Sequence, residues 1–188
     1  MADQRILSTE KMVGAGHATL ADTINRLVLV EHNNDGTHKF GKLFAAQHVA
    51  ATLTGNTNET TLFSVVIPAN TLGPNGVLEI TSLFTVPNGS GANKTVKVKF
   101  GGTAFFQYTV GTGIGSIQNK VMVRNRNSAS SQVAAAAGQL YSFGYPATGV
   151  LVSAIDTTID QTLAVTGQLA NAADSITLED VFAEVLRP

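Results

Sequence analysis

Beyond residue 60 the sequence alternates apolar and polar residues with a period of two, and this pattern constrains the fold more than any other feature. Successive side chains of a strand point to opposite faces, so alternation marks strands with one buried and one solvated face. In the segment Lys94–Phe100, for example, Val96 and Val98 alternate with Lys97 and Lys99. The pattern predicts a β-protein rather than a helical one.

Similar runs continue to the end of the chain, separated by Gly, Asn and Pro, which favour turns. The predicted strands are Thr61–Ile67, Val77–Val86, Lys94–Phe100, Thr103–Val110, Ile117–Arg126, Gln139–Phe143, Gly149–Ala154, Gln161–Leu169 and Ser175–Leu186. Gly101-Gly102 predicts a tight hairpin, and a change of phase at Glu179-Asp180 predicts a β-bulge. Because no helical pattern separates the runs, residues 60–188 are predicted to form an antiparallel, jelly-roll-like β-sandwich.

Residues 1–55 have a different character and are predicted to form an N-terminal anchoring arm with one or two short helices. One helix begins at the capping-box pattern Thr19–Asp22 and ends near His32, and a second spans Leu43–Thr52. Isolated helices of this length are marginal in water, so the arm needs a surface to lie on. The apolar residues expected to anchor it are Leu20, Ile24, Leu27, Val28, Leu43 and Phe44.

Charged residues make up only 13% of the 188 residues, and the formal net charge is −1. This share is about half of the ~25% that is usual, so part of the surface is expected to be uncharged or hidden against other subunits. Nucleic-acid binding is not expected, because it requires clustered Lys and Arg. The basic residues of the body are expected on solvated strand faces: Lys94, Lys97, Lys99, Arg124 and Arg126.

The sequence also lacks cysteine, an apolar run near the ~20 residues of a membrane span, and a signal-peptide pattern after Met1. We therefore expect no disulfide, no membrane insertion, and synthesis and assembly in a cytoplasm.

No recognised catalytic or metal-binding motif is present. The four histidines, His17, His32, His38 and His48, lack the i, i+4 spacing of a helical zinc motif. The stretch 111–115 resembles a phosphate-binding loop but lacks the following Lys-Ser/Thr and helix, so a hairpin tip is expected there. We predict no catalytic residue, no metal site and no cofactor.

The densest acids of the body are Asp156, Asp160, Glu179 and Asp180. A glycosidase needs two such carboxylates facing each other across a sugar cleft. Residues 156–158 instead have the pattern of a turn, and the chain has no tryptophan to stack on sugar rings. We therefore expect a protein that is not an enzyme.

Several sequence blocks resemble a module of tailed-bacteriophage virion proteins. In the body they are TLFSVVIP followed by NTLG (61–68, 70–73), VLEIT (77–81), NKTVKVKFGGT (93–103), VRNRNS (123–128) and TLAVTGQLANA (162–172). Residues 14–26 and 31–33 look like the leader segments found ahead of such modules. The resemblance covers most of the chain, and none of these blocks is a catalytic motif.

The resemblance implies a jelly-roll β-sandwich that is commonly trimeric and occurs in capsid decoration proteins, head fibres or tail appendages. The leading hypothesis is therefore a virion protein, assembled in the host cytoplasm, that decorates or cements the capsid. Its partners would be further copies of itself and the major capsid protein, held by the arm.

Two alternatives stay open. One is a tail component (a fibre, spike base or tail-tip protein), whose arm would dock on a tail protein. The other is a module that binds host surface glycans through exposed loops containing Tyr141, Phe143 and Tyr145.

Overall fold

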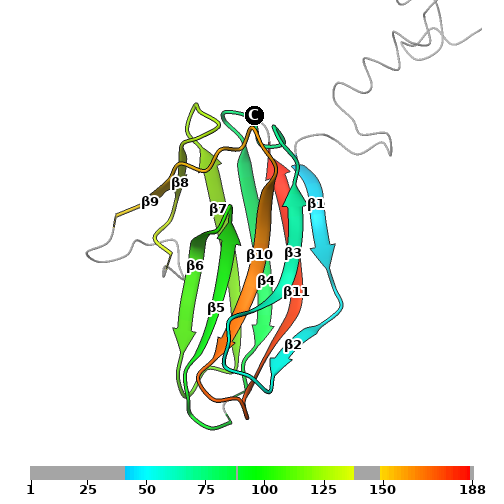
Figure 1. Cartoon of the computed structure of the whole chain (residues 1–188), viewed down its shortest axis with the longest axis vertical. Coiled ribbons are helices and arrows are strands. Elements are labelled where there is room, and N and C mark those ends of the chain that lie inside the picture. Colours follow the sequence, from blue (N-terminus) through cyan, green and yellow to red (C-terminus); the bar gives the residue numbers. More distant parts are fainter. Residues whose placement is uncertain (1–40, 88, 138–148, 187–188) are drawn as a thin grey trace, which may run out of the picture. The chain divides into compact units, whose positions relative to one another are not determined.

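The computed structural model describes residues 41–87, 89–137 and 149–186, and within these ranges every regular element is a strand (Figure 1). The strands are β1 (Gly41–Gln47), β2 (Ala51–Thr54), β3 (Thr60–Ile67), β4 (Val77–Thr85), β5 (Lys94–Phe100), β6 (Thr103–Val110), β7 (Ser116–Asn125), β8 (Gln132–Ala134), β9 (Leu151–Ser153), β10 (Gln161–Leu169) and β11 (Ser175–Leu186). No helix of this part of the chain is long and apolar enough to cross a membrane.

The strands form two sheets that pack face to face, which confirms the predicted antiparallel β-sandwich. The larger sheet has seven strands in the order β1-β11-β4-β7-β8-β9, with β2 also paired to β11, and the smaller has the order β3-β10-β5-β6. Most consecutive strands lie in opposite sheets, as β3, β4 and β5 do. The chain therefore crosses repeatedly between the two sheets.

The space between the sheets is filled by the apolar residues of the alternating runs. Leu78, Ile80 and Phe84 of β4 are fully buried, as are Val96 of β5 and Leu163 of β10. Burying such a side chain contributes about 1.5–3 kcal/mol relative to leaving it exposed, so this shared core accounts for the pairing of the two sheets.

Two local predictions are confirmed. Gly101 and Gly102 both have positive φ, +52° and +80°, and join β5 to β6 in a two-residue hairpin that favours glycine at both positions. The register between β11 and β4 shifts between Leu178 and Asp180, which is the predicted bulge.

The predicted helix over Leu43–Thr52 is wrong, because this stretch covers most of β1 and the first half of β2. Both strands pair with β11, and Leu53 of β2 is buried in the core. The local apolar spacing is short and weak, whereas the edge of β11 supplies backbone partners to both strands. Residues 41–54, assigned to the arm from the sequence, are thus strands of the larger sheet.

Two further details differ from the prediction. The stretch 111–115 connects β6 of the smaller sheet to β7 of the larger one, so it is a crossing between sheets and not a hairpin tip. The short strand β8 was not predicted at all. The helix over residues 19–32 and the strand Gln139–Phe143 lie outside the described residues.

Candidate interaction surface

The two outer faces of the sandwich differ in chemistry. Outward positions of the smaller sheet carry mostly short polar or basic side chains. These residues are Thr61, Ser64, Val66, Thr95, Lys97, Lys99, Ala104, Gln107, Thr109, Thr162, Ala164, Thr166 and Gln168. Val66, which is 52% exposed, is the one large apolar side chain among them. This face has the polar character expected of a sheet surface in contact with water.

The outer face of the larger sheet also carries polar residues, such as Thr81, Thr85 and Gln118, but has a set of large apolar side chains in addition. They are Val77 and Leu83 on β4, Met122 on β7, Val133 on β8, Val152 on β9, and Phe182 and Leu186 on β11. One row of directly opposed neighbours runs across five strands as Leu186, Val77, Arg124, Val133 and Val152. We call this surface the apolar face.

The apolar face also carries charged side chains, which are Glu79 on β4, Lys120 and Arg124 on β7, and Asp180 and Glu184 on β11. Glu79 is only 8% exposed, and its carboxylate forms an ion pair with the ammonium of Lys120, at an N–O distance of 2.6 Å. Glu184 lies directly opposite Glu79 on β11. Within the described part of the chain Glu184 has no cationic partner, and Arg124 has no carboxylate partner, since its guanidinium contacts Met122 instead.

Lys94 corrects the expectation that all basic residues of the body are solvated. It shares the inward parity of Val96 and Val98, and its ammonium pairs with Asp174 at 3.1 Å, with both side chains 2% exposed. Asp174 also accepts hydrogen bonds from the hydroxyl and the backbone N–H of Ser90. The hydrogen bond from the Ser90 hydroxyl has the largest effect and lowers the pKa of Asp174. The bond from the Ser90 N–H and the ammonium of Lys94 lower it further.

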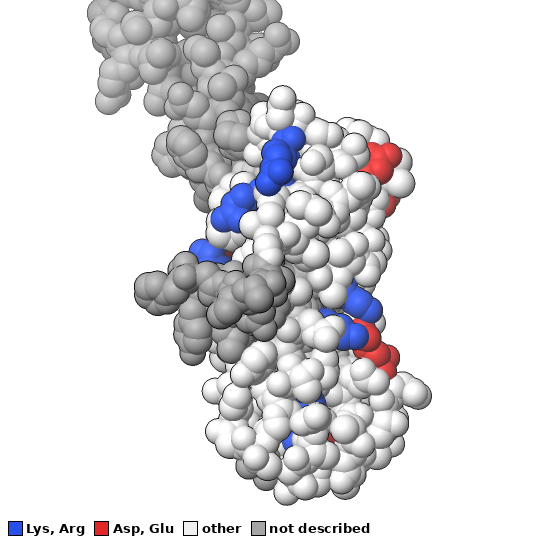
Figure 2. All heavy atoms as spheres, turned by 90° about the vertical axis from the view of Figure 1, so that its left-hand side faces the viewer, with Lys and Arg blue, Asp and Glu red and all other residues white. Residues whose placement is uncertain are grey.

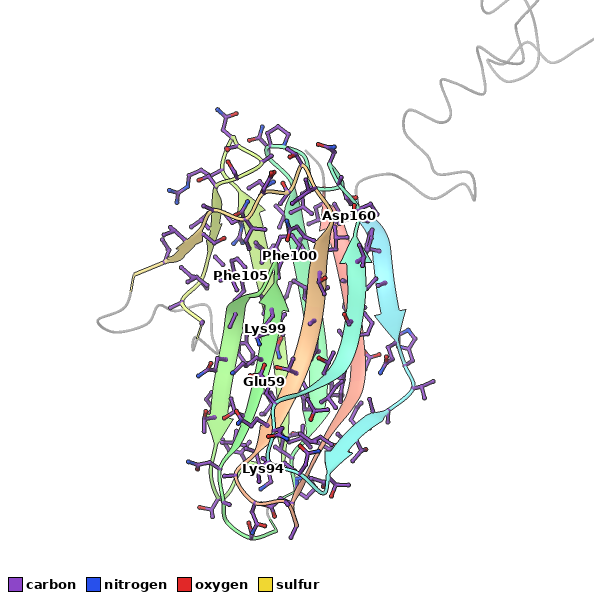
Figure 3. All side chains as sticks on the ribbon, in the orientation of Figure 1. Glu59, Lys94, Lys99, Phe100, Phe105 and Asp160 are labelled. Carbon is purple, nitrogen blue, oxygen red and sulfur yellow. The ribbon has the colours of Figure 1, made fainter. Side chains whose placement is uncertain are left out.

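Glu59, in the loop before β3, holds a second ion-pair cluster on the outer face of the smaller sheet. Its two carboxylate oxygens each lie 2.6 Å from an ammonium, one from Lys97 and one from Lys99, and Thr166 donates a further bond (Figure 3). The hydrogen bonds from Lys97 and then Lys99 lower the pKa of Glu59 to about 2. Lys97 and Lys99 thus lie on the outer face as predicted, where both are paired with Glu59. Arg124 and Arg126 are exposed.

A buried polar network joins loops at the opposite end of the sandwich. The Gln132 amide donates to Asn125 Oδ1 and to the Ile155 carbonyl, and accepts from the Ile155 N–H and the Ser153 hydroxyl. Asn125 in turn donates to Thr157. Such a network is favourable when its members are paired, and it fixes the loops around it.

The four acids singled out in the sequence do not converge on a site. Asp156 accepts bonds from the hydroxyl and N–H of Thr158, as the predicted turn requires, and these bonds lower its pKa. Asp160 accepts the Ala69 N–H, and Asp180 pairs with the imidazole of His48. In residues 41–87, 89–137 and 149–186, no group of three or more His, Asp or Glu side chains could hold a metal ion.

Of the predicted anchoring residues, only Phe44 has a described side chain. It packs, partly buried, against the core of the sandwich and is not a free anchor. Leu43 lies in β1. Leu20, Ile24, Leu27 and Val28 lie outside the described residues, as do the loop aromatics Tyr141, Phe143 and Tyr145.

Sequence reasoning missed the apolar face because the alternation within one strand does not tell which sheet faces water. The register supplies this information, since it aligns outward residues from five strands that are far apart in the sequence.

Neither a family model nor a curated protein matches the chain. Among solved structures, it is similar to the CBM36-1 domain of a multidomain xylanase from the hindgut metagenome of Trinervitermes trinervoides. The TM-score is 0.35 and the identity 13%, over 73% of this chain and 77% of that chain. The CBM2 module of the evolved Dit of Lactobacillus casei BL23 phage J-1 gives a TM-score of 0.34 and 11% identity, over 64% and 67%.

The VP2 subviral particle of infectious bursal disease virus gives a TM-score of 0.28 and 13% identity, over 80% of this chain and 42% of that chain. At these TM-scores and identities the likenesses do not identify a function.

Proposed function

We propose that the chain is a structural protein of a tailed-bacteriophage virion, a capsid decoration, cement or head-fibre protein without catalytic activity. Residues 1–40 would hold it to the major capsid protein, and the sandwich would be displayed as a homotrimer. This boundary replaces residue 55, because residues 41–54 are strands of the sandwich.

The observation that carries the proposal is where the virion-like blocks lie in the fold. The block 61–68 forms β3 and its end, 77–81 begins β4, and 93–103 contains β5 and its hairpin. The block 123–128 closes β7, and 162–172 contains β10. The resemblance is thus a resemblance of the sandwich framework, as expected for a module whose role is structural.

The surface of the body adds support, since it offers few charges to steer a charged ligand. Figure 2 looks onto the edge formed by β9, β8 and β6, and most of the described side chains there are uncharged. Such a surface suits a protein that is packed into a particle in many copies, where weak contacts add up by avidity.

Quantitative mass spectrometry of purified particles from the source of this sequence tests the proposal. We expect on the order of hundreds of copies per particle, as icosahedral decoration requires. A copy number that is a small multiple of the tail symmetry would refute the capsid role and support the tail alternative. Absence from particles would refute a virion role altogether.

A further inference from the structure

We propose that the apolar face is where a second copy of this chain docks, with the β11 half of one face meeting the β7 half of the next. The inference deepens the proposed function, because it names the surface through which the copies associate, and it rests on that function only for the self-association.

The first argument is the contrast between the two outer faces. Both belong to one sandwich, yet seven large apolar side chains lie on the apolar face and Val66 alone on the other. Leu83 is 38% exposed and Val152 is 62% exposed. The other five are partly exposed. Apolar side chains that gather, at least partly exposed, on one face of a soluble domain mark an interaction surface.

The second argument, which selects the occupant, is charge complementarity. Glu184 of β11 and Arg124 of β7 lie on either side of β4, two strand spacings across and two residues along the strands, or ~12 Å apart. Glu184 has no cation and Arg124 no carboxylate among the described side chains, while Glu79, on β4 between them, is already paired with Lys120 of β7. Counting only described side chains, the face has an acid without a cation on its β11 half and a base without a carboxylate on its β7 half.

A second copy supplies what each half lacks. When the β11 half of one face lies on the β7 half of the next, Glu184 meets the partner's cation and the partner's carboxylate meets Arg124. A cyclic ring satisfies the contact in every copy, and the proposed trimer is one such ring. The surrounding apolar residues exclude water, which strengthens the charge pair.

The test of the surface compares two matched variants of the full chain by light scattering across a range of concentrations. Leu83→Lys places a charge on the apolar face, and Val66→Lys places the same charge on the outer face of the smaller sheet. We expect Leu83→Lys to raise the dissociation concentration of the oligomer at least about tenfold and Val66→Lys to leave it unchanged. A monomeric wild type, or equal effects of the two variants, would overturn the proposal.

The test of the charge pairing uses a swap. Glu184→Arg and Arg124→Glu should each weaken association, and the double variant should restore it, because the opposite charges again meet across the interface. A double variant that associates no better than either single variant would overturn the pairing. Thermal unfolding of each variant separates lost association from lost folding. If Leu83→Lys does not fold, the charge-swap variants provide the test of the surface.

The outcomes also separate this inference from the proposed function. An oligomer that depends on the apolar face but never enters particles leaves the inference standing and refutes the virion role. A virion protein whose Leu83→Lys variant assembles normally refutes the inference alone.

Discussion

The ammonium of Lys94 lies 3.1 Å from the carboxylate of Asp174, and both side chains are 2% exposed. Lys94 begins β5 and Asp174 immediately precedes β11, so the pair joins the smaller sheet to the larger. Figure 3 labels Lys94 at one end of the sandwich. A buried ion pair of this kind adds little over a well-packed apolar pair, but its members depend strongly on each other.

We predict that Lys94→Met lowers the melting temperature by several degrees, because it leaves the buried carboxylate of Asp174 without its cation. Lys97→Met is the matched control: it removes a lysine from the same strand, but its ammonium is partly exposed and Glu59 keeps Lys99. Calorimetry of the two variants should show the larger drop in melting temperature for Lys94→Met. The double variant Lys94→Met/Asp174→Leu should recover part of that drop. A double variant that melts no higher than Lys94→Met would contradict the pairing.

Glu59 gives a pH dependence whose sign can be worked out. Its pKa is about 2 in the folded protein against 4.5 ordinarily, so its contribution is complete above 4.5 and is lost as the pH falls towards 2. Glu59→Gln should therefore lower the free energy of unfolding by roughly 1–2 kcal/mol at pH 7, allowing for partial exposure. In urea unfolding the difference from wild type should shrink between pH 4.5 and pH 2. A constant difference would show that Glu59 acts by packing.

Gln132 is the centre of the network at the other end of the sandwich. Gln132→Leu keeps a similar volume but leaves the Ile155 N–H and the Asn125 amide oxygen without their partner. Each buried unpaired group costs about 1–3 kcal/mol, so we expect a loss of roughly 3 kcal/mol or more. Chemical denaturation measures it, and Ser130→Ala in the exposed loop nearby is a control expected to change little. A loss below about 1 kcal/mol would show that water replaces the Gln132 amide.

The sandwich could be predicted from the sequence because each long run carries its own evidence. In β5 and β10, parity alone identifies the buried face. Lys94 shows the limit of this reasoning. Its position in the alternation points inward, but its charge led to the prediction that it faces solvent. Its buried partner Asp174 lies 80 residues further along the chain. Likewise Gln132 looks like an ordinary polar residue, and only the fold brings Asn125, Ser153 and Ile155 around it.

The N-terminal strands were missed for a related reason, and they give the last prediction. The short segments of β1 and β2 are defined by pairing with β11, not by alternation within themselves. Removing residues 1–40 keeps every strand of the sandwich, so this variant should fold with nearly the stability of the full chain. Removing residues 1–55 also deletes β1, β2 and the buried Leu53, and exposes one edge of β11.

We therefore expect the longer truncation to unfold at a lower temperature and to aggregate, because an uncovered strand edge pairs with other chains. Calorimetry and light scattering on the two truncations measure both effects. Equal stability of the two would show that β1 and β2 add nothing to the sandwich. The shorter truncation is then the proper reagent for the anchoring role: it should stay folded and no longer join particles, and if it still binds them as well as the full chain does, residues 1–40 are not the anchor.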